Sequence, residues 1–153
     1  MHRFYTFTIE KEAQKDSCPC IFLMERKGHG GIQGNCYGYF EAKKTWEEAE
    51  IECQSYHRGT HLASILTLAE TLVVANHIMS YQTKPSNVWI GLHDIRHNGK
   101  WRWSNESTYN YKAWMLGKPN LRTKEYCVEL VHFTKWNNTA CHKLNAYICK
   151  HEL

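Results

Sequence analysis

The chain has 153 residues, which suits one domain with a terminal tail and leaves little room for a second independent core. Hydrophobic residues make up 42% of the sequence and aromatic residues 13%, so we expect a packed core and exclude general disorder. Nineteen Lys and Arg against fifteen Asp and Glu give a formal charge of +4 without any long basic run, so the composition indicates no nucleic-acid partner.

Seven cysteines are many for a cytosolic chain of this size and natural for an exported one. Zinc binding is the rival interpretation, but the one close pair, Cys18 and Cys20, lacks the two-residue spacer of a common zinc knuckle. We therefore expect disulfides. Residues 1–14 conflict with export, because they contain no apolar run long enough for a signal peptide or a membrane span. The cysteines carry more weight, so we expect a secreted protein whose signal peptide is not evident, and not an integral membrane protein.

The first predicted elements are a tail, a strand and a helix. Residues 1–17 are polar and mixed, and we expect them to form a poorly ordered tail before a domain at 18–151. The run 36–40 has strand character. Thr45 and Glu48 then form a capping box, in which the threonine caps a helix and the glutamate reaches back to the cap. Apolar residues follow at helical spacing on one face: Trp46, Ala49, Cys53 and Tyr56.

A second helix is predicted where Thr67 and Glu70 repeat the capping pattern. Its apolar stripe is expected at Leu72, Ala75, Ile78 and Met79. After Pro85 the pattern changes to short strand-like pieces, at 88–92, 101–103, 126–131 and 146–150. The fold class expected is α+β, with two helices packed on short antiparallel strands and long irregular loops held by crosslinks.

The order of the tryptophans and cysteines is more specific than the composition. It is carried by the segments Trp46–Glu50, Cys53, His61–Ile65, Trp89–Leu92, Trp101–Trp103, Cys127–Leu130, Trp136, Cys141 and Cys149. From about Cys18 to His151 the chain resembles the C-type lectin-like domain family. Within that family, 35–40 and 52–56 are most similar to the regenerating-islet-derived lectins, in particular their type four branch, and 126–131 is similar to snake venom C-type lectins.

The resemblance implies a set of disulfides. Cys53 would pair with Cys149, and Cys127 with Cys141. A third bridge would join Cys36 to Cys18 or Cys20, and the one of that close pair left over could link two chains into a dimer.

The resemblance also implies where calcium would bind. Sugar-binding members hold the ion through a Glu-Pro-Asn or Gln-Pro-Asp triplet, a later Glu, and an Asn-Asp pair after a tryptophan. The matching positions here are Lys118, Asn120, Glu125, Asn137 and Asn138. Lysine offers donors but no acceptor, and the second asparagine replaces an acid, so this site is degenerate and we expect no metal or other cofactor.

Sugar can still be bound directly by amide, carboxylate and hydroxyl groups. The first candidates are Asn120, Glu125, Asn137 and Asn138, with the alternative that the last two satisfy loop backbone groups. The polar loop 94–100 is a second candidate surface, at Asp94, Arg96, His97 and Asn98. The tryptophans at 89, 101, 103 and 136 are interpreted as core or loop anchors rather than as sugar platforms.

Catalysis finds little support. His57 and His61 lie four apart without the glutamate of a metalloprotease, and the chain has no nucleophile elbow or phosphate-binding loop. Two sequons, at Asn105 and Asn137, would accept glycans in a secreted protein, and a glycan on Asn137 would cover the candidate loop.

These observations lead to a non-enzymatic carbohydrate-recognition module. It would bind extracellular glycans, either mannose-type or acidic polysaccharide, without calcium, and cell-surface glycoprotein receptors are further candidate partners. The alternative is a signalling or toxin-like lectin-like protein that binds protein partners and no sugar.

Overall fold

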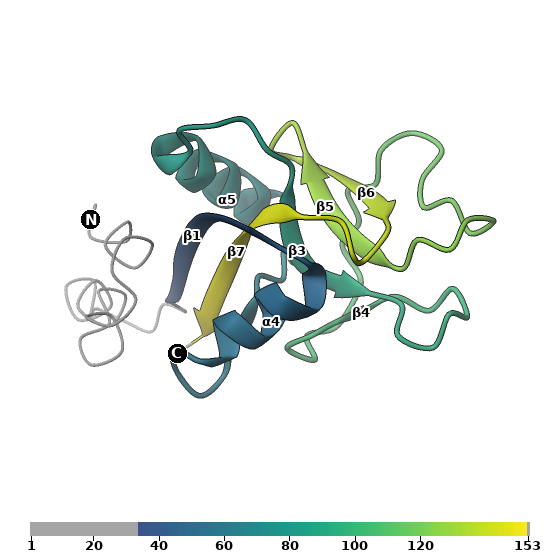
Figure 1. The fold of residues 1–153 in the computed structure, drawn as a ribbon, viewed down its shortest axis with the longest axis horizontal. Coiled ribbons are helices and arrows are strands. Elements are labelled where there is room, and N and C mark those ends of the chain that lie inside the picture. Colours follow the sequence, from purple (N-terminus) through teal and green to yellow (C-terminus); the bar gives the residue numbers. More distant parts are fainter. Residues whose placement is uncertain (1–33, 153) are drawn as a thin grey trace.

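A computed structural model describes residues 34–152 as one seven-stranded sheet with two helices (Figure 1). In chain order the elements are β1 Asn35–Lys44, α4 Trp46–Gln54, β2 Thr60–Leu62, α5 Leu68–Tyr81, β3 Val88–His93, β4 Arg102–Trp103, β5 Cys127–Val131, β6 Lys135–Thr139 and β7 Asn145–Glu152. The strands are arranged β1-β7-β3-β5-β6, with β2 also paired to β7 and β4 to β3. The fold class is α+β, as expected. The expected tail at 1–17 and the part of the domain before residue 34 lie outside the described residues.

Helix α4 begins as its sequence predicts. Thr45 accepts a hydrogen bond from the backbone N–H of Glu48, and the Glu48 side chain accepts one from the backbone N–H of Thr45, so the capping box is complete. Trp46, Ala49 and Cys53 are buried, and so is Tyr56 beyond the end of the helix. The predicted face of α4 is confirmed.

Helix α5 is present as predicted, but its predicted apolar stripe is wrong at two positions. Leu72 and Met79 are 58% and 54% exposed. The buried residues are Thr71, Val74, Ala75, His77 and Ile78. The spacing of 71, 74, 75 and 78 forms an equally good helical stripe, and its smaller side chains fit against the sheet while the larger Leu72 and Met79 face outward.

The sheet differs from the expected one in two respects. Strand β3 runs parallel to β7, with Val88 opposite Ala146, so the sheet is mixed rather than antiparallel. Strands β2 and β6 were not expected. The sequence of β6 is polar and is typical of a loop, but it pairs along its length with β5 through a tight turn, where His132 and Phe133 both have positive φ.

The sheet has an apolar cluster on each of two faces because side chains alternate along its strands. Tyr37 and Tyr39 of β1 belong to the cluster that includes Val74 and Ile78 of α5. Phe40 of the same strand belongs to the cluster that includes α4. All four tryptophans expected to be anchors, at 89, 101, 103 and 136, are buried.

Two expected disulfides are confirmed. Cys53 of α4 is bonded to Cys149 of β7, and Cys127 of β5 is bonded to Cys141. Cys36 is buried, and its expected partners, Cys18 and Cys20, lie outside the described residues, as does the spare cysteine of the expected dimer.

A buried ion pair joins helix α5 to the last strand. The Lys150 ammonium lies 2.7 Å from a Glu70 carboxylate oxygen and donates to the Ser64 hydroxyl at 2.9 Å and to the Ser64 carbonyl at 3.1 Å. Lys150 is buried, and a buried ammonium needs such a set of acceptors. Among the helices that the structure describes, none is long and apolar enough to span a bilayer.

The connections between β3 and β5 are mostly irregular and gather at one end of the domain, away from the C-terminus (Figure 1). Their longest part is tied to β6. Met115 N–H donates to the Trp136 carbonyl, and Trp136 N–H donates to the Ala113 carbonyl, each at 2.9 Å. This end of the molecule carries most of the predicted site residues.

Candidate functional site

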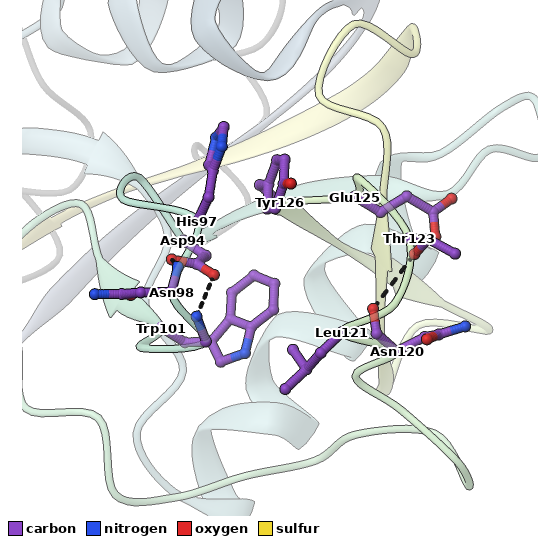
Figure 2. A pocket seen from close by; sticks show the side chains of 10 residues that line it. Asp94, His97, Asn98, Trp101, Asn120, Leu121, Thr123, Glu125 and Tyr126 are labelled. Carbon is purple, nitrogen blue, oxygen red and sulfur yellow. Dashed lines mark hydrogen bonds between the residues drawn. The ribbon is translucent and has the colours of Figure 1, made fainter.

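Two loops enclose a pocket of about 320 Å³ at this end of the domain (Figure 2). One loop follows β3 and the other precedes β5. The lining residues are Asp94, His97, Asn98, Gly99, Trp101, Asn120, Leu121, Thr123, Glu125 and Tyr126.

Asp94 shapes the first loop. It is buried, and its two carboxylate oxygens accept hydrogen bonds from the backbone N–H groups of Asn98 at 3.1 Å and Gly99 at 2.8 Å. Its own N–H donates to the Tyr126 carbonyl at 2.8 Å, which links this loop to the second one. Asp94 therefore supports the pocket rather than offering a free carboxylate to a ligand.

His97 and Tyr126 join the two loops through their rings. The ring centroids are 3.5 Å apart and the planes are tilted by only 5°. His97 has a positive φ of 57°, a conformation that a turn residue can hold, and this places its ring over the tyrosine. The pair forms an aromatic rim beside polar groups, which suits a ligand that has both apolar and hydroxylated faces.

Asn138 of β6 fixes the second loop. It is 1% exposed, its amide oxygen accepts from Asn120 N–H, and its amide nitrogen donates to the carbonyls of Asn120 and Glu125, all at 2.9 Å. These three bonds satisfy loop backbone groups, which was the alternative interpretation of this residue. The Asn138 amide is therefore engaged in hydrogen bonds within the protein.

The residues present do not fit a calcium ion. Lys118 supplies an ammonium group where the resemblance implies an oxygen ligand. The Asn138 nitrogen points its two hydrogens at carbonyl oxygens that would otherwise be available to a cation. Glu125 is the one carboxylate of the matched set, and one of its oxygens accepts a hydrogen bond from the Thr123 hydroxyl at 2.6 Å. Among the described residues no group of three His, Cys, Asp or Glu side chains is placed to hold a metal.

Asn137 belongs to a separate hydrogen-bond network outside the pocket lining. Its amide nitrogen donates at 2.8 Å to Glu129, a buried carboxylate that also accepts from Lys143 at 2.8 Å and from Asn145 at 2.9 Å. The Lys143 ammonium and the Asn145 amide, together with Asn137, thus compensate the buried charge of Glu129.

Both sequon asparagines use the amide nitrogen that a glycan would need. Asn137 donates to Glu129, and Asn105 donates to the Ser64 hydroxyl at 2.9 Å. A glycosylated asparagine keeps one amide N–H, so these bonds do not decide whether glycans are attached, and the glycans stay a prediction.

The structure brings together five of the predicted sugar-binding residues and leaves three outside the pocket lining. The five are Asp94, His97, Asn98, Asn120 and Glu125. Arg96 is exposed on the first loop but does not line the pocket, and Asn137 and Asn138 are engaged as described. The sequence did not indicate that Trp101, Leu121, Thr123 and Tyr126 complete the lining. Tyr126, just before β5, is a weak sequence signal for a binding site, because its role in the pocket depends on stacking against His97 of the other loop.

The sequence between residues 42 and 151 matches the family model described as the Lectin C-type domain. Human regenerating islet-derived protein 4 is 39% identical over 122 residues, covering 78% of this chain and 75% of the relative. A C-type lectin mannose-binding isoform from Notechis scutatus scutatus is 39% identical over 149 residues, covering 95% of this chain and 89% of the relative.

A solved structure of human lithostathine superposes with a TM-score of 0.76 at 35% identity, covering 92% of this chain and 94% of that one. The family model, these similarities, the mixed sheet with its two helices and the two disulfides agree with one another. The chain belongs to the C-type lectin domain family.

Proposed function

We propose that this protein is a secreted, non-enzymatic module that binds glycans without calcium through the pocket between the loops 94–101 and 120–126. The observation that carries the proposal is the Asn138 amide, which holds the second loop with hydrogen bonds in the place where the family would use a cation. A pocket that is pre-formed in this way needs no metal to present its polar groups.

Three features support a glycan as the ligand. The pocket combines amide, hydroxyl and carboxylate groups with the aromatic rim of His97 and Tyr126. A relative of similar length is named as a mannose-binding isoform. The cationic side chains on the same loops extend the candidate ligands from mannose-type glycans to acidic polysaccharides. Secretion is supported by the two disulfides, which persist in oxidising compartments.

Binding to a glycan array, repeated with a chelator, tests this function. We expect mannan or sulfated glycans to bind equally well with and without chelator, and Glu125→Ala to weaken that binding. Glu47→Ala is the matched control, because Glu47 is an exposed carboxylate on α4 outside the pocket lining. Binding that is lost with chelator would contradict calcium independence. No glycan binding by a folded protein would favour the alternative, a protein ligand that recognises protein partners.

A further inference from the structure

The loop end of the domain concentrates positive charge. The span 94–126 carries the cationic residues Arg96, Lys100, Arg102, Lys112, Lys118, Arg122 and Lys124. It has three acidic residues, and one of these, Asp94, is buried with both oxygens occupied. In the rest of the described chain, acidic side chains slightly outnumber cationic ones, and α4 alone has four glutamates. The molecule is therefore electrically polarised, with its loop end positive.

Leu116, at this end of the domain, is fully exposed in a hydrogen-bonded turn. Leu116 has a relative exposure of 102%, which means that its side chain contacts essentially nothing in the domain. It lies in a turn closed by a hydrogen bond from Lys118 N–H to the Met115 carbonyl, and Gly117 supplies the positive φ of 80°. Met115 is itself bonded to Trp136 of β6. The turn cannot easily fold its leucine back onto the protein.

Two more aliphatic side chains in the span 94–126 are exposed. Leu121 is 64% exposed and lies next to Gly99, and Ile95 is 65% exposed at the start of the first loop. Each of the three is followed within two residues by a cation, namely Lys118, Arg122 and Arg96. Exposed aliphatic groups interleaved with cations are the composition of a surface that enters the boundary region of a bilayer.

We propose that the loop end docks on anionic lipid bilayers, with Leu116 inserted among the acyl chains and the neighbouring cations at the headgroup phosphates. A polysaccharide would satisfy the cations but would bury little of Leu116, because its chains are hydrophilic. A bilayer satisfies both, since it presents negative headgroups above an apolar interior. Leu116, which carries the proposal, does not line the glycan pocket, although Leu121 does.

Co-sedimentation of the full chain with vesicles tests the proposal. The vesicles are phosphatidylcholine alone or phosphatidylcholine with about one third phosphatidylserine. We expect binding to the anionic vesicles, weakened by salt, and little binding to the neutral ones. Leu116→Ser should weaken it about tenfold, and Lys118→Gln about fivefold.

Leu72→Ser is the matched control, since Leu72 is an exposed leucine on α5, outside the loops. It should bind like the parent, and all variants should keep the melting temperature of the parent. Heparin binding separates the two kinds of anionic surface: Leu116→Ser should retain it while losing the vesicles. Equal vesicle binding by Leu116→Ser and the parent would overturn the proposal, and so would equal binding of the parent to neutral and anionic vesicles.

Discussion

Asn138 is buried and makes three hydrogen bonds that require both a donor and an acceptor on one side chain. An aspartate has the same shape but would keep only the bond from Asn120 N–H. Its second oxygen would face the carbonyls of Asn120 and Glu125, where the amide hydrogens now lie. Whether residue 138 carries an amide nitrogen or a second carboxylate oxygen thus decides whether the loop is held by hydrogen bonds to that side chain or needs a cation.

We expect Asn138→Asp alone to destabilise the domain by about 1–3 kcal/mol, because it leaves two carbonyls without donors and buries a carboxylate beside them. Thermal unfolding measures the effect. Asn137→Asp is a useful comparison, because it would remove the donor to Glu129 without touching the loop. An Asn138→Asp protein as stable as the parent would show that the loop does not depend on the amide.

The double variant Lys118→Glu with Asn138→Asp should acquire calcium affinity. It adds two acidic groups beside the loop that carries Asn120 and Glu125, whose side chains still offer oxygen ligands, while Asn137 stays in its network with Glu129. Calorimetry with calcium on the parent and the double variant is the measurement. Tight binding by the parent would contradict the proposed calcium independence. No binding by the double variant would show that this loop does not form a cage.

At the scale of secondary-structure elements, α5 carries a titratable residue in its packed face. Burial lowers the pKa of His77 to about 4, and the Tyr37 and Tyr81 rings contact it. The same burial raises the pKa of Tyr37, so that ring stays neutral at acid and neutral pH. The unfolded chain binds a proton at His77 more readily than the folded one.

Stability should therefore fall as the pH is lowered from about 6.5 to about 4, and His77 contributes up to about 3 kcal/mol of that loss. Chemical unfolding at several pH values measures it. His77→Gln removes the titration at similar size, so the difference between parent and variant isolates this residue from the carboxylates that also titrate. Parallel pH profiles would contradict the prediction.

The sequence allowed both helices to be predicted because their caps are local signals, read from Thr45 and Thr67. It did not indicate which side of α5 is buried, because two stripes of similar hydrophobicity compete and only the sheet decides between them. The strand β6 was missed because it is polar, and its pairing with β5 is a tertiary fact. The pocket was predicted only in part. Family positions indicated Asn120 and Glu125, but no local sequence pattern predicts that their loop lies against the loop of His97.

At the scale of the whole molecule, the uneven distribution of charge matters more than the formal charge of +4. The positive loop end and the acidic α4 would orient the domain toward an anionic surface before contact. Histidines change this balance unequally. A histidine with the ordinary pKa of about 6.5 gains charge on mild acidification. His77 stays neutral there because burial lowers its pKa to about 4, and burial also lowers the pKa of His93.

Heparin retention should therefore increase between about pH 7.5 and about pH 5.5, and salt should weaken it at both values. Column elution at the two pH values measures this. His77→Gln should leave the increase unchanged, because the pKa of His77 lies below this pH range. Equal retention of the parent at both pH values would show that the histidines are far from the contact surface.

The position of β7 sets the timing of folding during synthesis. This last strand lies between β1 and β3, also pairs with β2, and carries Cys149, whose partner is 96 residues earlier. A nascent chain can form its helices on the ribosome, but it cannot close the sheet until Asn145–Glu152 has emerged. Until then β1 and β3 each lack β7 as a neighbour on one edge, and Cys53 has no native partner. Premature termination before Asn145 would therefore yield no smaller stable version of the domain, only an aggregation-prone chain for the cell to retain and degrade.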